Sequence, residues 1–135
     1  MKNEKKKNTP VSEPTRSELE ILQVLWQYGP STVRFVNDRL NEHKREVQYA
    51  STLKLMQIMA DKGLLRRDES QVKHIYSAAT EAYKTKSLLL DRFVDSLFGG
   101  SVSSLMQHLL DHQQASQQEL DEIRALLNQS KKNKP

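Results

Sequence analysis

The sequence of 135 residues contains no cysteine, which excludes disulfide bonds and thiolate metal sites and is typical of a reducing compartment such as the cytoplasm. Glycine and proline are sparse, with four of each, and no glycine-rich phosphate loop is present. No apolar run approaches the roughly 18–20 residues that cross a membrane, so we expect no membrane insertion. The basic residues 1–7 are not followed by an apolar segment, and we therefore expect no secretory signal.

The net charge of +4 is unevenly distributed along the chain. Residues 1–79 hold 14 Lys and Arg against 10 Asp and Glu, whereas residues 80–135 hold seven of each kind. The excess positive charge therefore lies wholly in the first part of the chain. Such an asymmetry is typical of a nucleic-acid-binding module, although many basic domains bind no nucleic acid.

The segment that begins at residue 15 predicts a first helix. Thr15 and Glu18 have the spacing of a capping box, in which a hydroxyl and a carboxylate satisfy free backbone N–H groups. Apolar residues follow at helical spacing, and Gly29-Pro30 ends the pattern; they include Leu19, Leu22, Leu25 and Trp26. Residues 1–14 offer almost nothing to bury, so we expect a mobile tail there.

Two further helices are predicted before residue 64. Ser31 is placed to cap the first of them, whose apolar face carries Val33, Val36 and Leu40. The polar residues 41–46 predict the connection to the next helix, from about Gln48 to Lys62. Gly63 fits the left-handed residue that closes such a helix. On a helical wheel of 100° per residue, one face of this third helix belongs to the core: Thr52, Leu55, Met56 and Met59.

A small β-hairpin is predicted after the third helix. Residues 64–67 can form one strand, residues 68–71 a turn, and residues 72–77 a second strand with β-branched and aromatic side chains. Three helices followed by a hairpin outline a winged helix-turn-helix domain over residues 15–80. About 65 residues suffice for a marginal core of that size. The fold class predicted for the whole chain is therefore mainly α.

Residues 81–130 show only helical patterns: a long helix from about Glu81 to Phe98, a joint at Gly99-Gly100, a short helix after Ser101, and a helix after a second capping box at Ser116. Roughly 50 residues make too small a core alone. We expect a helical dimerisation domain that packs against a second copy, in a homodimer; folding back onto the first domain is the alternative. The apolar positions expected to pack are Leu89, Phe93, Leu97, Leu105, Leu109, Leu120, Ile123 and Leu127. Residues 131–135 are expected to form a flexible tail.

The polar face of the third helix suits the major groove of double-stranded DNA. Small, hydroxyl, amine and amide side chains there can approach base edges, so we predict that bases are read by Ala50, Ser51, Lys54 and Gln57. Leu53 could touch a thymine methyl group or pack against a neighbouring helix. Flanking residues predict phosphate contacts: Lys44, Arg45, Tyr49, Lys62, Arg66, Arg67 and Lys73. The alternative is an ordinary solvated polar face.

No pattern in the chain indicates an enzyme, a cofactor or a metal site. His43 and His74 have no nucleophile or acid beside them in the sequence pattern. His108 and His112 are four residues apart, a spacing that can hold zinc, but no third ligand has a matching spacing. A second function class stays open, a protein-interaction adaptor that docks a partner through Leu53 and Ile58 without sequence-specific DNA binding.

Several segments, in this order and spacing, resemble the BlaI/MecI/CopY family, the bacterial penicillinase-repressor family. The resemblance covers about residues 15–128. It is carried by five segments: Leu19–Trp26 ending in Gly29-Pro30, Tyr49–Thr52, Asp61–Arg67, Tyr76, and Phe93–Val102 with its Gly99-Gly100 joint. The resemblance implies a dimeric winged-helix repressor that binds an inverted-repeat operator and blocks transcription.

The resemblance also implies a mode of release. In the antibiotic-sensing branch a membrane sensor-protease system triggers cleavage within the C-terminal segment, which corresponds here to residues 104–110. The best-known branch has Asn-Phe where this chain has His108-Leu109, so this pair marks the possible cleavage region. The copper-sensing branch uses cysteines, and their absence excludes copper sensing by that motif.

Overall fold

The computed structural model describes residues 13–43, 46–112 and 115–133, and the chain divides into two compact units, residues 1–89 and 90–135. Residues 1–12 of the predicted N-terminal tail lie outside the described residues, as do Lys44 and Arg45.

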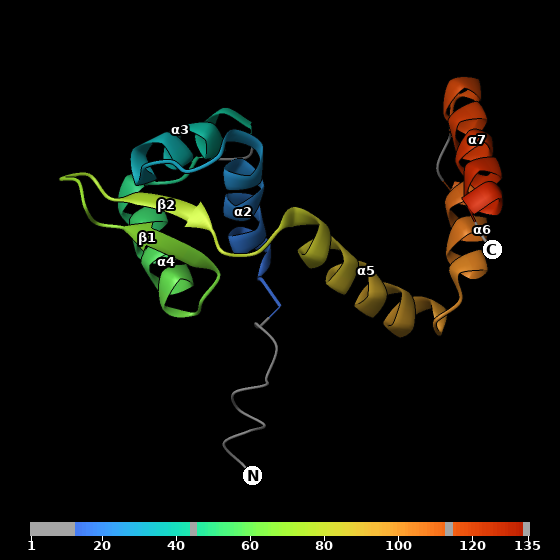
Figure 1. Cartoon of the computed structure of the whole chain (residues 1–135), viewed down its shortest axis with the longest axis horizontal. Helices are drawn as coiled ribbons and strands as arrows, with labels where there is room; N and C mark the ends of the chain where they lie inside the picture. The colour runs from blue at the N-terminus through green and yellow to red at the C-terminus, as the bar shows by residue number, and fades with distance from the viewer. Residues whose placement is uncertain (1–12, 44–45, 113–114, 134–135) are drawn as a thin grey trace, which may run out of the picture. The chain divides into compact units, whose positions relative to one another are not determined.

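The first unit contains helices and a hairpin in the order expected of a winged helix-turn-helix domain. Its elements (Figure 1) are α2 (Arg16–Tyr28), α3 (Val33–His43), α4 (Tyr49–Asp61), β1 (Leu65–Asp68), β2 (Ile75–Ala78) and the first turns of α5 (Ala82–Phe98). The two strands are antiparallel, with Leu65 opposite Ala78 and Asp68 opposite Ile75. The predicted fold class, mainly α with a small hairpin, is confirmed.

The core of this unit lies where α2, α3 and α4 meet the hairpin. Every apolar position predicted for the second helix is buried, as are Met56 and Met59 of α4. The buried cluster comprises Ile21, Leu22, Leu25, Val33, Val36, Leu40, Met56, Met59, Leu64, Leu65 and Tyr76. Leu55, which the wheel placed on the core face, is only half-buried. Trp26 adds a polar tether, because its indole Nε1 donates a hydrogen bond of 2.9 Å to the carbonyl of Thr80.

The capping box at the start of α2 is present and does more than begin the helix. The Thr15 hydroxyl accepts from the Glu18 backbone N–H at 3.2 Å, and the Glu18 carboxylate accepts from the Thr15 N–H at 2.9 Å. Glu18 is only 2% exposed, and its second oxygen lies 2.7 Å from Nζ of Lys62 at the end of α4. Burial alone raises the pKa of Glu18, but the hydrogen bonds from Lys62 and Thr15 and the Lys62 charge outweigh burial and lower it.

Two amide side chains hold the helix-turn-helix in shape. The Thr52 hydroxyl of α4 donates a buried hydrogen bond of 2.7 Å to Oδ1 of Asn37 in α3. Asn41, near the end of α3, donates to the Val47 carbonyl at 3.0 Å and accepts from the Val47 N–H at 2.8 Å. Because buried polar groups must be paired, the Asn37–Thr52 contact fixes how α4 lies on α3.

The start of α3 differs from the expected one. Ser31 does not cap the helix: the Thr32 hydroxyl accepts from the Phe35 N–H at 3.1 Å instead. The reason is that the backbone of Ser31 exchanges two hydrogen bonds, of 2.9 and 2.8 Å, with Tyr76 of β2. This bridge adds a third extended segment beside the hairpin, which the sequence pattern did not reveal.

The hairpin begins and ends at different residues from those predicted. Gly63 has the left-handed φ of +88° expected of it, and the Leu64 N–H returns to the Met59 carbonyl at 2.9 Å, a geometry typical of a Schellman closure. Asp68 belongs to β1 rather than to the turn, and residues 72–74 precede β2. The loop of residues 69–74 is therefore longer than expected, because Val72 is fully exposed and has no packing partner to extend the strand.

The second unit contains the rest of α5, then α6 (Val102–His112) and α7 (Gln117–Asn133). Gly99 and Gly100 both have positive φ, +58° and +81°, which explains why glycine stands at this joint. The second capping box is present, with Ser116 and Glu119 exchanging hydrogen bonds. α7 runs to Asn133 and thus includes three residues assigned to the C-terminal tail.

The apolar side chains of the second unit are largely uncovered. Among its described residues, Val94 alone is buried. Four of the predicted dimerisation positions are exposed, Phe93, Leu97, Leu109 and Leu127, and three are half-buried, Leu105, Leu120 and Ile123; Leu89, in the first unit, is half-buried too. Val102, Leu110 and Leu126 are also exposed. No helix within residues 13–43, 46–112 and 115–133 is long and apolar enough to cross a membrane.

We predict that Glu18→Gln lowers the free energy of unfolding by about 1–3 kcal/mol, because the charged hydrogen bond to Lys62 is lost while the amide can still cap α2. Urea unfolding followed by circular dichroism measures the change. Asp38→Asn, which removes an exposed carboxylate from α3, serves as the matched control and should stay within about 0.5 kcal/mol of the parent. Equal stabilities of Glu18→Gln and the parent would contradict a stabilising ion pair.

The same contact makes stability depend on pH in a defined direction. Since the folded state lowers the pKa of Glu18 below 4.5, the unfolded chain binds more protons in that window. The contribution is therefore fully present above pH 4.5 and is lost as the pH falls through the folded value. We expect the stability gap between the parent and Glu18→Gln to close under acid conditions, which unfolding curves at several pH values will show; a constant gap would contradict the assignment.

Candidate nucleic-acid interface

α4 presents two chemically different faces. Thr52, Met56 and Met59 are buried, with at most 1% exposure, and attach the helix to α2 and α3. The opposite face consists of exposed side chains at the positions predicted to read bases, Ala50, Ser51, Lys54 and Gln57. Leu53 lies between the faces and is half-buried against the core. The structure thus leaves a small, polar helix surface free, and base reading by these four residues stays a prediction.

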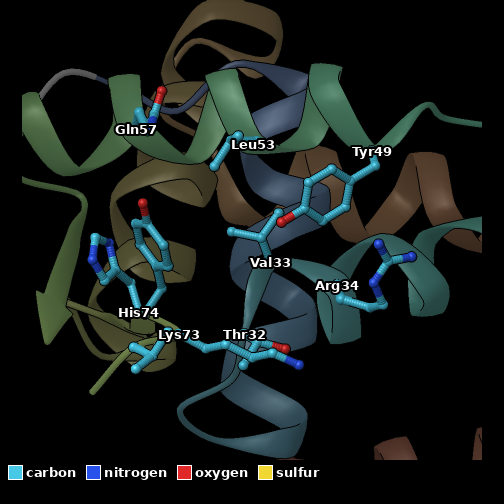
Figure 2. Close-up of a pocket in the computed structure, with 10 residues that line it drawn as sticks. Thr32, Val33, Arg34, Tyr49, Leu53, Gln57, Lys73 and His74 are labelled. Atoms are coloured by element: carbon cyan, nitrogen blue, oxygen red, sulfur yellow. The ribbon is translucent and has the colours of Figure 1, made fainter. Parts of the chain in front are cut away.

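A hollow of about 340 Å³ lies beside this face, between the start of α3, α4 and the approach to β2. Figure 2 shows Tyr49 and Leu53 pointing into it from α4, with Arg34 on one side and His74 on the other; Gln57 and Lys73 also line it. Its lining combines an apolar floor with three basic side chains. No carboxylate lines this hollow in the described part of the chain.

Arg34 is held in place by an aromatic ring. Its guanidinium carbon lies 4.8 Å from the ring centroid of Tyr49, within the distance of a cation–π contact. Within residues 13–43, 46–112 and 115–133, no carboxylate forms an ion pair with Arg34. Arg39, five residues further along α3, differs: it pairs with Glu42 and lies over Phe35.

The structure separates the residues predicted to contact phosphates. Tyr49, Arg66 and Lys73 are exposed. Lys62 pairs with the buried Glu18 and so has a structural role, while its side chain keeps 34% exposure and its contact with phosphate stays a prediction. Arg67 is engaged too: Nε lies 2.6 Å from Glu69, and a hydrogen bond to Tyr76 raises the pKa of Arg67. Lys44 and Arg45 lie outside the described residues.

Two basic residues that line the hollow, Arg34 and His74, are not among the predicted DNA contacts. Arg34 stands on the exposed side of α3 and follows Val33, which is buried; that placement was available from the apolar spacing of the helix. His74 was considered as a catalytic residue only. Its place beside the hollow depends on the hairpin loop, which no local pattern predicts.

The part of the chain that the structure describes contains no group of three or more His, Asp, Glu or Cys side chains that could bind a metal ion. His108 and His112 lie next to each other on α6, with ring centroids 4.3 Å apart, and His108 also contacts Phe98. No catalytic pair emerges at the hollow, whose titratable lining is basic or phenolic.

The first unit is a winged helix-turn-helix domain with an exposed polar face on α4 and basic side chains beside it. These features place the protein in the class of DNA-binding proteins. The family model of the penicillinase repressor matches residues 14–129, and the chain belongs to that family of DNA-binding transcriptional repressors. The penicillinase repressor of Staphylococcus aureus is 21% identical over 116 residues, which cover 86% of this chain and 91% of that protein. The expected family membership is thereby confirmed.

The structural assignment of Lys62 leads to a prediction. Lys62→Met keeps the aliphatic stem but leaves Glu18 buried without its cation, so the free energy of unfolding should fall by about 1–3 kcal/mol. Arg66→Met, a matched change at an exposed basic residue, should change it by no more than about 0.5 kcal/mol. Urea unfolding of both variants measures this. The combination of Lys62→Met with Glu18→Gln should cost less than the sum of the two single changes, because both remove one contact; additive losses would refute the pairing.

Proposed function

We propose that this protein is a dimeric transcriptional repressor that recognises an inverted-repeat operator through α4. The observation that carries the proposal is the division of α4 into a buried face, with Thr52 and Met56, and an exposed face, with Lys54 and Gln57. A helix held so firmly on one side can enter a groove without losing its own packing. Family membership supports the same function.

Each exposed residue of α4 suits a different contact in the major groove. Ala50 and Ser51, in the first turn, are small enough to let the backbone approach the DNA. Gln57 can form a bidentate pair with adenine, and Lys54 can reach the acceptors of guanine. Tyr49, Arg66 and Lys73 surround this face and would add contacts to phosphates, which strengthen binding to any sequence.

Loss of these side chains should affect sequence choice more than general affinity. A duplex selected from a random pool by the parent protein provides the operator probe. We predict that Lys54→Ala and Gln57→Ala each lose about 1–3 kcal/mol of preference for that duplex over a random one. Fluorescence anisotropy at fixed salt measures both affinities.

The matched controls are Lys84→Ala on α5 and Gln27→Ala on α2, which remove exposed side chains of the same kinds away from α4. Both controls should keep the parental preference. If the parent selects no sequence at all, even at low salt, repression through an operator is wrong. If a protein partner is then bound through Leu53 and Ile58, the adaptor function replaces it; Ile58 is 40% exposed and available for such a contact.

The uncovered apolar side chains of the second unit support the dimer. Leu97 is 65% exposed and Leu127 is 61% exposed, although both continue apolar stripes of their helices. Burial of one such side chain contributes about 1.5–3 kcal/mol, so a second copy that covers several of them gains substantial stability. A two-fold dimer would also match the symmetry of an inverted repeat.

We predict a full-length species of about twice the chain mass of 15.6 kDa in sedimentation at micromolar concentration. The double variant Leu97→Glu with Leu127→Glu should be monomeric, because buried carboxylates without partners oppose association. Val72→Glu places the same charge on an exposed apolar residue of the first unit and should leave the dimer intact. A monomeric parent, or a double variant that still dimerises, would overturn this part of the proposal.

Release from DNA is the final part of the proposal. Two linked reading units gain about 10²–10⁴-fold in affinity through effective concentration, and separation removes that gain without any change in α4. A cut within residues 104–110 by a sensor-protease system would act in this way. His108 and Leu109 are exposed on α6, which supports access to this stretch once the helix opens locally.

A further inference from the structure

We propose that the hollow beside α4 is a binding site for the sugar–phosphate backbone of DNA, in which Arg34 and His74 join Lys73, and that protonation of His74 strengthens binding. The inference rests on the proposed DNA binding and extends it to two residues and to a dependence on pH. It concerns the positioning of the duplex, not the choice of bases.

The charge of the hollow supports an anionic occupant. Arg34, Lys73 and His74 line it, and none of them has an ion pair or hydrogen bond to another described residue. An unneutralised group of cations around one concavity is unfavourable until an anion enters it. A phosphodiester supplies one negative charge and acceptor oxygens, and charge-assisted hydrogen bonds to it are stronger than neutral ones.

The shape of the hollow supports a backbone segment rather than an isolated anion. Its basic side chains lie on opposite sides, with Arg34 at one and His74 at the other, an arrangement that suits a chain of linked phosphates and sugars (Figure 2). Between them lies a floor that includes Val33 and Leu53, which suits the apolar surface of a deoxyribose. The hollow also adjoins Gln57, so a backbone seated there would run beside the groove that α4 reads.

Tyr49 prepares Arg34 for this role. The ring contact at 4.8 Å holds the guanidinium before DNA arrives, which reduces the conformational entropy lost on binding. The second arginine of α3, Arg39, cannot act in the same way, because its guanidinium forms an ion pair with Glu42 and lies over the Phe35 ring. It also does not line the hollow.

His74 links the site to pH. A histidine side chain changes charge between about pH 5 and 8, and only the imidazolium adds a cation to the hollow. The groups that face it are Arg34, Tyr49, Lys73 and Tyr76 of the lining. The nearby carboxylates of the hairpin are engaged elsewhere: Glu69 pairs with Arg67, and Asp68 accepts from the Ser70 N–H at 2.9 Å. DNA phosphates therefore supply the negative charge that stabilises the imidazolium.

The test compares full-length Arg34→Ala and His74→Gln with the parent, by anisotropy, on the selected duplex and on a random duplex. Both variants should bind both duplexes more weakly by a similar factor, since backbone contacts carry no sequence information. Over a rise from about 50 to 200 mM salt, the loss of affinity should be about 3- to 4-fold smaller for Arg34→Ala than for the parent, as expected when one phosphate contact is removed. Arg39→Ala is the matched control and should keep the parental salt dependence.

The pH arm uses the same duplexes at about pH 6 and pH 8. The gain in affinity from about pH 8 to about pH 6 should be up to about fivefold larger for the parent than for His74→Gln. This factor corresponds to the free energy of one exposed ion pair. Thermal unfolding, followed in parallel, should show parental midpoints for both variants, because the two side chains are exposed.

The outcomes separate this inference from the proposed function. If the parent binds no duplex, the proposed function fails before the hollow is tested. If the parent binds but Arg34→Ala and His74→Gln match it in affinity, salt dependence and pH dependence, the hollow is not a backbone site. If Arg34→Ala weakens only the selected duplex, Arg34 reads a base and the assignment to the backbone is overturned.

Discussion

The firm attachment of α4 by one face is the constraint on which the rest of this protein depends. Apolar burial of Met56 and Met59 supplies the free energy, while two polar contacts set the direction. Thr52 binds Asn37 at a buried point near the start of α4, and Lys62 binds Glu18 at its end. Apolar contacts tolerate rotation of a helix, whereas hydrogen bonds between buried groups do not. The exposed face of α4 is consequently presented in one orientation.

The pair of Glu18 and Lys62, two residues 44 positions apart in the chain, joins the start of α2 to the end of α4. The same carboxylate completes the capping box of α2. Helix initiation, tertiary packing and the position of the recognition surface therefore meet at one side chain. This arrangement explains why a basic residue next to the DNA-facing surface can be structural: its charge is already matched by a buried anion.

The basic side chains on the surface of the first unit fall into two groups, those paired with a carboxylate and those without such a pair. Lys62 and Arg67 are paired with carboxylates of the protein, Glu18 and Glu69. Arg34, Lys73 and His74 have no ion pair among the described residues, and they lie around one hollow beside the polar face of α4. The net charge of +4 says nothing of this division. In the second unit it is the apolar side chains that lack contacts, since Val94 alone of its described side chains is buried.

Local patterns were enough to predict the helices, both capping boxes, the left-handed closure at Gly63 and the division of α4 into two faces, because each depends on residues within one or two turns. They could not predict that Ser31 would bridge to Tyr76 and leave the capping of α3 to Thr32, since that bridge joins residues 45 positions apart. These patterns also could not predict that Lys62, unlike Arg66, pairs with a buried carboxylate, or that Arg34 and His74 line the same hollow. Side-chain pairing across the fold depends on how the helices pack, and one-dimensional spacing carries no information about it.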